Sequence, residues 1–505
     1  MGLRDYTLYE VIKRNARVHK DKIALVFGEQ RITHKEFLEK VDRLAYGLFS
    51  AGIRKGDRIA VLSQNNLEFI YLFGAAAKIG AIMLPINWRL NQEEIEYVVL
   101  NGTPKIIFVG SEFQPMISPS ISKFGFIEKY YSMNQDEGIF EPFNELLKEG
   151  NKSSLGAEVG SDDGYIILQT AAIQGRPRGA VLSHRNLITS NLQVMYNWGL
   201  KKEDVHLLLL PLFHFTGVGL FFAVLQTGGL NIILPKFDVD IALKCIQEDR
   251  VTIFGEFPPI LKAMLDKAQD DYYGLSSLRG VVGLDQPETV KRFEEMTGAT
   301  FWTVYGQSET SGFVSTAPFF ERPGSAGVPS FIAEMEIMDD YGNILETGKI
   351  GEILVQGPLV FQGYWNLKEE NEFVFRDGWH HTGDMGKFDE DGYLWYTGRT
   401  PAKELIKQGG ENVYPAEVEK IILGHPFIEE VAVIGVPDSQ WGEAIKAVCV
   451  LREGKSMTEA QLIEFVAGRI ARFKKPKYAV FTSNLPRTED GHIDREKVKA
   501  NYGSA

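Results

Sequence analysis

A chain of 505 residues is longer than one hydrophobic core supports, so its length predicts two or three domains. Its two cysteines, Cys245 and Cys449, exclude a disulfide framework and a cysteine-rich metal site, and they fit a reducing, cytoplasmic setting. The net charge of −13 argues against general nucleic-acid binding and favours small-molecule chemistry.

The first three hundred residues alternate between short aliphatic runs and helical patterns. RIAVLS at residues 58–63 is followed by NLEFIYLFGAAAKIG at 66–80 and by AIMLPI at 81–86. The same rhythm continues to FWTVYG at 301–306. Aliphatic runs that alternate with helices are typical of parallel sheets covered by helices on both faces, so we expect a doubly wound arrangement up to about residue 305.

One apolar stretch, residues 207–225, is nearly long enough to cross a membrane. Pro211 and Gly217 interrupt it, and no basic flank marks a cytoplasmic side. It therefore predicts a strand, a turn and a helix buried in a soluble core, and we expect no transmembrane segment.

The composition and the predicted secondary structure of the sequence change twice after residue 305. Residues 324–398 are rich in glycine and short strands, which indicates an antiparallel or barrel-like subdomain. From residue 400 onward the pattern predicts a compact α+β unit. We thus expect an N-terminal domain over residues 1–399 and a C-terminal domain over 400–505. The C-terminal part holds 15 Lys/Arg and 15 Asp/Glu, so the surplus negative charge belongs to the N-terminal part.

Two motifs suggest phosphate chemistry. In LQTAAIQGRPRG, residues 168–179, a strand runs into a glycine-containing loop with two arginines, and a helix is expected near Ser183. Backbone N–H groups in such a turn can hold a phosphate. In VYGQSET, residues 304–310, Glu309 follows the end of a predicted strand. A hard cation that bridges phosphates needs such a carboxylate.

Three further motifs follow in order: WHHTGDMG at residues 379–386, AKELIKQGGENVYPAEVE at 402–419 and LPRTEDGHIDREKVK at 485–499. Together the five motifs resemble those of the adenylate-forming superfamily of acyl-CoA synthetases, luciferases and peptide-synthetase adenylation domains. The resemblance spans residues 8 to 498 and is nearest to fatty-acid, medium-chain or aryl acyl-CoA ligases. It implies an α/β fold with two doubly wound parallel sheets and a small β-barrel in the large domain. It also implies a mobile α+β C-terminal domain that pivots near Lys403.

The resemblance also assigns roles to residues. For contacts with ATP or AMP it implies Thr170, Gly175, Arg178, Tyr305, Gly306, Gln307, Ser308, Asp384 and Arg399. For catalysis it implies Glu309, which would also hold Mg²⁺, His214 beside the reacting carboxylate, Lys403 and His492. For the acyl group it implies Phe213, Phe215, Phe257 and Gly283. For coenzyme A it implies Lys407, Gly409, Gly410, Glu411 and Lys474.

Several positions depart from the family pattern. Residues 171–174 lack the hydroxyl groups usual in the phosphate loop, and Arg178 replaces a lysine. His492 stands where the family has a lysine that bridges the acyl carboxylate and the α-phosphate. A histidine is mostly neutral at pH 7 and has a shorter reach. Arg487, Arg495 and Lys497 are the nearby cations that could take its place.

The resemblance implies a carboxylate–CoA ligase that forms acyl-AMP from a carboxylic acid and MgATP, then acyl-CoA from acyl-AMP and CoA. Because the departures weaken the adenylation half, two alternatives stay open. One is an enzyme specialised for the thioester-forming half, and the other is a non-catalytic acyl-adenylate-binding protein. We expect a small carboxylic acid as substrate, ATP, Mg²⁺ and CoA as co-substrates, no nucleic-acid partner and a cytoplasmic location. A homodimer stays open, as does the identity of the acid.

Overall fold

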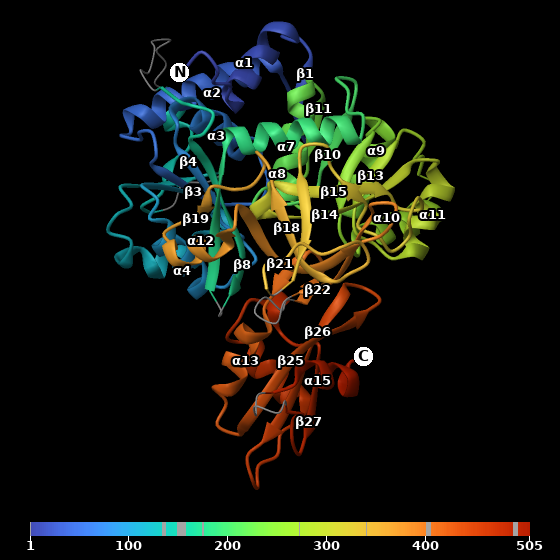
Figure 1. The fold of residues 1–505 in the computed structure, drawn as a ribbon. Coiled ribbons are helices and arrows are strands. Elements are labelled where there is room, and N and C mark those ends of the chain that lie inside the picture. Colours follow the sequence, from blue (N-terminus) through green and yellow to red (C-terminus); the bar gives the residue numbers. More distant parts are fainter. Residues whose placement is uncertain are drawn as a thin grey trace.

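The computed structural model describes residues 2–133, 138–148, 158–173, 176–271, 273–339, 341–399, 406–487 and 493–504. Three predicted site residues, Gly175, Lys403 and His492, lie outside these ranges. Figure 1 shows a large body, formed by the N-terminal four fifths of the chain, from which a smaller C-terminal domain projects on one side. The predicted division into a large and a small domain is thus confirmed, whereas the predicted boundary at residue 400 stays a prediction.

The helices have the following bounds: α1 Leu8–Val18, α2 His34–Ser50, α3 Leu67–Ile79, α4 Gln92–Gly102, α5 Gln114–Ile117, α6 Glu145–Lys148, α7 His184–Asn197, α8 Phe215–Thr227, α9 Val239–Glu248, α10 Ile260–Asp270, α11 Pro287–Thr297, α12 Lys368–Val374, α13 Pro415–Leu423, α14 Glu459–Ala467 and α15 Arg495–Tyr502. Several begin at a capping box, in which the N-cap side chain and the third residue of the helix exchange hydrogen bonds with each other's backbone. Thr33 and Glu36 start α2 in this way, Asn91 and Glu94 start α4, and Ser183 and Asn186 start α7.

The first sheet of the large domain has eight strands in the order β19-β9-β8-β4-β3-β5-β6-β7. Their bounds are β3 Arg58–Leu62, β4 Ile82–Pro85, β5 Ile106–Val109, β6 Lys129–Ser132, β7 Glu141–Pro142, β8 Gly164–Ile173, β9 Arg176–Ser183 and β19 Gly363–Tyr364. The central strands pair in parallel, and nearly every residue in β3, β4 and β5 is buried. Strands covered on both faces read as continuous aliphatic runs, which is why the sequence predicts them.

The second sheet has nine strands in the order β16-β15-β14-β13-β12-β10-β11-β1-β2. Their bounds are β1 Ile23–Phe27, β2 Gln30–Thr33, β10 Val205–Leu208, β11 Leu230–Ile233, β12 Ile253–Glu256, β13 Gly280–Gly283, β14 Thr300–Gln307, β15 Gly312–Pro318 and β16 Val328–Pro329. Its core, from β1 through β11, β10, β12 and β13 to β14, is parallel. These two sheets confirm the predicted doubly wound α/β fold.

The apolar stretch at residues 207–225 folds as expected. It contributes to the buried strand β10, turns at Pro211 and continues into α8, most of whose residues are buried. Among the residues that the structure describes, no helix is long and apolar enough to span a membrane.

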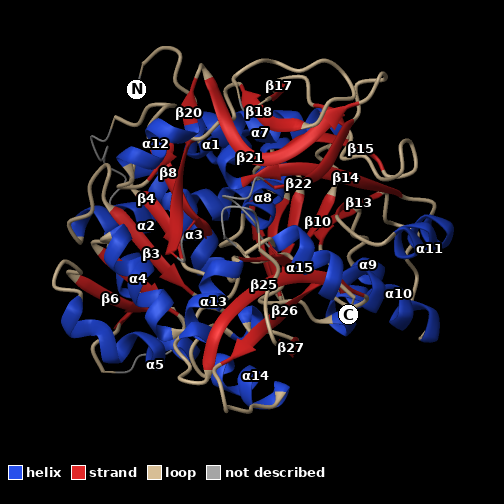
Figure 2. Ribbon diagram, turned by 60° about the horizontal axis from the view of Figure 1, so that its bottom comes forward, coloured by secondary structure: helices blue, strands red, loops and turns tan. Residues whose placement is uncertain are grey.

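The predicted antiparallel subdomain forms a five-stranded sheet. Its strands are β17 Glu334–Met338, β18 Gly351–Gln356, β20 Phe375–Arg376, β21 Trp379–Phe388 and β22 Leu394–Arg399, and every pairing among them is antiparallel. The small domain has a second five-stranded sheet, made of β23 Ile406–Gln408, β24 Glu411–Val413, β25 Ile428–Asp438, β26 Gly442–Leu451 and β27 Tyr478–Thr482. Figure 2 brings this sheet to the front, with α13, α14 and α15 around it.

One local expectation is wrong. The segment after the phosphate-loop motif continues as a strand, β9, which pairs back onto β8 in an antiparallel hairpin. Helix α7 does begin at the expected place, with Ser183 as its N-cap, but a full strand separates it from residues 174–175. The strand forms because Ala180 and Leu182 are buried opposite β8. The N-terminus of α7 therefore lies at the end of β9 opposite to Arg176.

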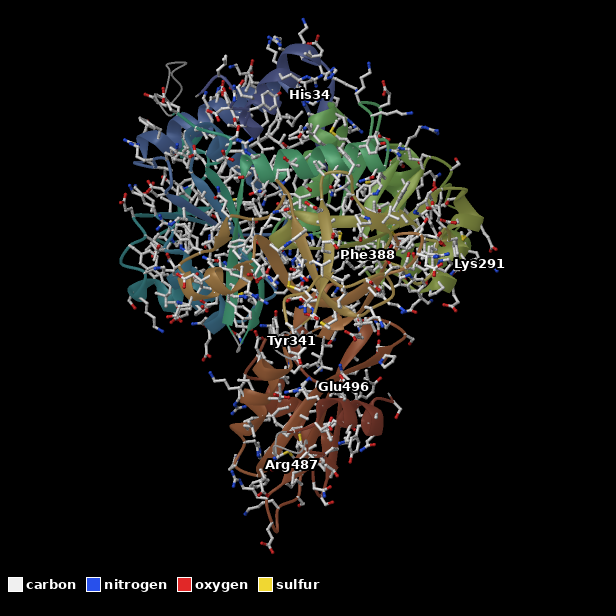
Figure 3. The ribbon with its side chains drawn as sticks, in the orientation of Figure 1. His34, Lys291, Tyr341, Phe388, Arg487 and Glu496 are labelled. Atoms are coloured by element: carbon white, nitrogen blue, oxygen red, sulfur yellow. The ribbon has the colours of Figure 1, made fainter. Side chains whose placement is uncertain are left out.

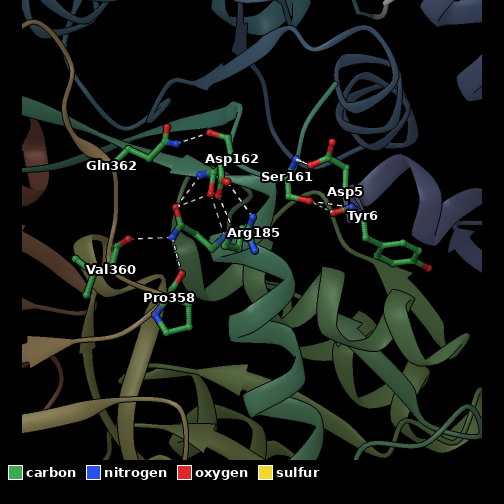
Figure 4. A network of polar contacts seen from close by, with 10 residues as sticks. Asp5, Tyr6, Ser161, Asp162, Arg185, Pro358, Val360 and Gln362 are labelled. Atoms are coloured by element: carbon green, nitrogen blue, oxygen red, sulfur yellow. Dashed lines mark hydrogen bonds and ion pairs between the residues drawn. The ribbon is translucent and has the colours of Figure 1, made fainter. Parts of the chain in front are cut away.

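A polar network fixes the segment that leads to β19 against the large domain (Figure 4). The side chain of Asn186 in α7 donates hydrogen bonds to the carbonyl oxygens of Pro358 and Val360, at 2.8 and 2.9 Å. Further along, Gln362 donates to the carbonyl of Asp162, and Arg185 pairs with the Asp162 carboxylate. The next residues of this segment consequently have a fixed position beside the candidate site.

Candidate active site

Several predicted site residues, together with Glu256, lie at one edge of the nine-stranded sheet. His214 follows β10, Glu256 and Gly283 end β12 and β13, and Gln307 ends β14. These strands are parallel, so their carboxyl ends meet at the same edge. In open α/β sheets, ligands bind outside this edge. The arrangement explains why residues more than ninety positions apart in the sequence belong to one site.

Asp384, on β21, lies at the centre of a buried polar cluster. Its carboxylate accepts hydrogen bonds from the Tyr305 hydroxyl at 2.9 Å and from the Gln307 side-chain amide at 2.6 Å. Arg399 Nε lies 3.0 Å from the other carboxylate oxygen. Burial alone would lower the pKa of Arg399, but the Asp384 carboxylate together with Tyr414 and Tyr396 outweighs it and raises that pKa. Four of the predicted nucleotide contacts are thus brought together.

A second cluster surrounds Glu309, which lies in the short 3₁₀ helix Ser308–Thr310. Tyr364, on β19, donates a hydrogen bond to Glu309 Oε1 at 2.7 Å. The buried guanidinium of Arg178, on β9, lies 4.0 Å over the Tyr364 ring, with Nη2 3.9 Å from Glu309. Its Nε and Nη1 atoms have no hydrogen-bond partner among the described residues. A buried cation with two such N–H donors is poised for an anion.

The small domain contacts this edge through Glu411. The Glu411 carboxylate forms an ion pair with Arg89, accepts a hydrogen bond from Asn87 at 3.3 Å and lies 3.2 Å from His214 Nε2. Burial opposes ionisation of Glu411, but His214 and Arg89 outweigh it and lower its pKa to about 2. A side chain of the small domain therefore lies 3.2 Å from the histidine predicted to stand beside the reacting carboxylate.

Two glycines allow this close approach. Gly409 and Gly410 both have positive φ, at 56° and 81°. A Cβ atom at Gly409 would lie 2.6 Å from the Trp441 ring, and one at Gly410 would lie 3.0 Å from the Phe257 ring. Any other residue at either position would be strained, and one at Gly410 would also press against Phe257 of the large domain.

The aromatic residues predicted for the acyl group lie around His214. The rings of Phe213 and His214 are 4.5 Å apart. Phe215, the first residue of α8, packs so closely against the backbone of Gly312 that a Cβ atom there would lie 2.4 Å from its ring. Phe257 contacts the glycine loop of the small domain instead.

Two residues predicted to contact coenzyme A have other surroundings. Lys474 is buried between Glu94 of the large domain and Glu417 of the small one, with its Nζ 2.5 and 2.8 Å from their carboxylates. It is thus an ion bridge between the domains in this orientation. Lys407 lies with Nζ 5.6 Å above the Tyr396 ring.

The cations considered as replacements for the lysine at position 492 are engaged within the small domain. Arg487 pairs with Glu430, Arg495 with Glu419 at 2.6 Å, and Lys497 with Asp494 at 2.8 Å. Figure 3 shows Arg487 in the part of the small domain that is remote from the large one. In this orientation these three described cations pair with carboxylates of the small domain and not with the candidate site.

Sequence reasoning missed four residues of the site. Tyr364 donates a hydrogen bond to Glu309. The other three, Arg89, Asn87 and Glu94, form the contacts of the large domain with Glu411 and Lys474 of the small domain. None belongs to a motif with a chemical signature. The capping box at Asn91 and Glu94 is a pattern that could have located the start of α4. It does not indicate that Glu94 contacts Lys474.

Comparison with known proteins places the chain in a family. A model described as AMP-binding enzyme matches residues 12–365, and a model of the AMP-binding enzyme C-terminal domain matches residues 417–492. The chain belongs to the AMP-binding enzyme family. The resemblance on which the predicted fold rests is thereby confirmed.

Two family members and a solved structure are similar over nearly the whole chain. Indoleacetate–CoA ligase of Aromatoleum aromaticum is 33% identical over 498 residues, which are 97% of each chain. A long-chain-fatty-acid–CoA ligase of Mycobacterium tuberculosis is 30% identical over 482 residues, 94% of each. The structure of o-succinylbenzoate CoA synthetase from Bacillus subtilis with a product analogue is 27% identical, covers 98% of each chain and has a TM-score of 0.86.

These similarities confirm the predicted enzyme class, an AMP-forming acid–thiol ligase. They do not favour the specialist for the thioester-forming half, nor the non-catalytic binding protein. Members of the family as a class use ATP and CoA with Mg²⁺.

Proposed function

We propose that this AMP-binding enzyme joins an apolar carboxylic acid to coenzyme A in two steps, through an acyl-AMP that stays bound between them. The observation that carries the proposal is the buried guanidinium of Arg178, whose Nε and Nη1 donors lack partners among the described residues. It belongs to the hairpin that contains the phosphate-loop motif and points toward Glu309.

ATP fits this environment. A buried cation is stable only when an anion balances it, and Glu309 lies 3.9 Å away, too far for a close ion pair. A phosphate group accepts two parallel hydrogen bonds from a guanidinium. Arg178 would bind the β- or γ-phosphate, while Asp384 and Arg399 would hold the ribose. Tyr305 would lie against the base.

Mg²⁺ fits as well. No group of three or more His, Cys, Asp or Glu side chains that could hold a metal is found within the described ranges. Mg²⁺ commonly binds through one or two carboxylates together with substrate phosphates. Glu309, held in place by Tyr364, would supply the carboxylate, and the ion would neutralise charge on the phosphates.

In the first step a carboxylate oxygen of the acid forms a bond to the α-phosphorus, and the bond from that phosphorus to the bridging oxygen breaks. Pyrophosphate leaves with the electron pair. His214 and Ser308 lie on the same edge and would bind the acid and the α-phosphate. Arg178 and Glu309 would stabilise the departing pyrophosphate, a contribution of the kind that fixed charges make in transition states.

In the second step the CoA thiolate forms a bond to the acyl carbon, and AMP leaves as the carbon–oxygen bond breaks. The orientation of the small domain described above suits this step, because the loop of Gly409 and Gly410 lies against the site. Glu411 would hold the loop there through Arg89 and His214. Rotation of the small domain between the steps would let one site serve two transition states.

The acid is expected to be apolar, because Phe213 and Phe215 flank His214. A cytoplasmic location and a homodimer stay predictions.

A panel of aromatic and aliphatic carboxylic acids tests the function. We expect at least one acid to give AMP, pyrophosphate and acyl-CoA in equal amounts when ATP, Mg²⁺ and CoA are present, measured by chromatography. Omission of CoA should leave one bound acyl-AMP per enzyme. If synthetic acyl-AMP and CoA react while no acid in the panel releases pyrophosphate, the two-step proposal fails and the half-reaction specialist replaces it.

A further inference from the structure

Glu256, the last residue of β12, is a carboxyl group in an unusual position. Its relative exposure is 0%, and neither carboxyl oxygen has a hydrogen-bond partner among the residues that the structure describes. Buried polar groups are almost always hydrogen-bonded, because leaving one unpaired costs free energy. None of the roles given above to the site residues uses this side chain. Among the described residues only the backbone amide of Leu261 acts on this carboxyl as a donor, so its complete burial needs another explanation.

The Glu256 side chain lies close to Gly283 on the neighbouring strand. The two residues are in register, and a Cβ atom at Gly283 would lie 2.1 Å from the Glu256 carbonyl oxygen and 3.0 Å from its Oε1. Position 283 therefore accepts only glycine. Asp285, two residues further on, also has a buried carboxylate oxygen, Oδ2, without a partner among the described residues.

The same face of the sheet carries Tyr305. Glu256, Gly283 and Thr303 are aligned across three neighbouring parallel strands. Aligned residues of parallel strands point to the same face, and so do residues two apart in one strand. Tyr305 therefore shares this face with Glu256, and the glycine between their strands leaves no side chain there. A flat ring stacked on Tyr305 and lying over Gly283 would present its edge to Glu256.

We propose that Glu256 recognises the base of the nucleotide by accepting a hydrogen bond from the exocyclic 6-amino group of adenine, with Asp285 as a second acceptor. The inference rests on the proposed function, since it presumes that ATP binds at this edge. A neutral carboxyl group can also donate its O–H to a ring nitrogen next to the amino group. It would then make two hydrogen bonds to the base.

The electrostatics of Glu256 agree with this role. Burial raises the pKa of Glu256 well above its ordinary value, and the nearby Asp285 carboxylate raises it further, while the backbone amide of Leu261 opposes them. Burial thus favours the uncharged form of this side chain.

The base must gain access to this carboxyl. Glu256 is shielded in the structure, and the residues next to it, Leu284 to Gln286, form a loop between β13 and α11 in which Leu284 and Gln286 are exposed. Binding of the base would displace this loop. A purely structural alternative is that Glu256 serves the start of α10 near Leu261, and such a role would be independent of the base.

Titration calorimetry on the full chain tests the inference with two nucleotides, ATP and purine riboside 5′-triphosphate, which lacks the 6-amino group. We expect wild type to bind ATP about tenfold more tightly, the effect of one well-formed hydrogen bond to a buried group. Glu256→Leu should bind both nucleotides equally. Glu256→Gln should keep most of the preference, because its amide has both an acceptor and a donor. Glu288→Leu, an exposed change on the neighbouring α11, is the matched control and should behave as wild type.

Three results would overturn the inference. The first is equal binding of both nucleotides by wild type. The second is that Glu256→Leu weakens the binding of both nucleotides by the same factor. The third is that Glu256→Gln folds but loses the preference for ATP. The wild-type comparison needs no variant, so a Leu variant that does not fold leaves the test intact. Failure of wild type to bind ATP at all would overturn the proposed function itself, and with it this inference.

Discussion

Replacement of Arg178 by methionine is expected to slow pyrophosphate release from ATP and acid by about a hundredfold to a thousandfold. Methionine fills a similar volume but removes the buried positive charge that faces Glu309. Conversion of synthetic acyl-AMP and CoA to acyl-CoA should change by less than about threefold, since no β- or γ-phosphate takes part. Single-turnover measurement of each half-reaction separates the two effects.

Arg178→Lys is the matched control for this prediction. Lysine keeps the charge but loses the planar fork and the stacking on Tyr364, so we expect intermediate adenylation. Equal losses in both half-reactions of Arg178→Met would indicate a structural role for Arg178. That result would remove the main support for phosphate binding at this position.

Replacement of Glu411 by glutamine is expected to slow the thioester-forming step by about tenfold to a hundredfold and to leave adenylation nearly unchanged. The change removes the charge that pairs with Arg89 and contacts His214, while it keeps the shape of the side chain. The glycine loop would then be held less often against the large domain. Rapid-quench kinetics with synthetic acyl-AMP and CoA measure the step directly.

Glu430→Gln is the control for Glu411→Gln. Glu430 pairs with Arg487 inside the small domain, remote from the large one (Figure 3), so its loss should leave both half-reactions unchanged. Slower adenylation in Glu411→Gln, with normal thioester formation, would contradict the assignment of this domain orientation to the second step.

The fold was largely predictable because its strands are covered on both faces. Runs such as β3, β4 and β5 are mostly aliphatic, and the helices between them have start signals at Asn66 and Asn91. The strand β9 was not predictable, because RPRG reads locally as a loop. Its pairing with β8 depends on the burial of Ala180 and Leu182, which is a tertiary effect.

Site residues that belong to a motif were predictable from the sequence. Residues that only support them from elsewhere in the chain were not. Glu309, Asp384 and Arg399 each belong to a recognisable motif. Tyr364, which holds Glu309, has no such signal, because its role depends on how β19 lies beside β9. The local sequence around Tyr364 carries no signal of its contact with Glu309, which is 55 residues away.

Charge alone was a poor guide to the roles of individual cations. The resemblance assigns Lys474 to coenzyme A, yet Lys474 is buried between two carboxylates. Lys477 likewise pairs with Asp438, 2.5 Å away. In this acidic protein both lysines form ion pairs with the protein's own carboxylates. Arg178 is the contrasting case, because its buried donors are left without partners among the described residues.

The most direct test of the two-step account follows the oxygen atoms of the acid. In a reaction with ATP, CoA and an acid whose carboxyl group carries ¹⁸O, the account predicts that one ¹⁸O appears in the phosphate of AMP, detected by mass spectrometry. The label arrives there because the carboxylate oxygen bonds to the α-phosphorus and leaves with AMP when the thioester forms. Unlabelled AMP, or label in pyrophosphate or in ADP and phosphate, would contradict the acyl-adenylate mechanism.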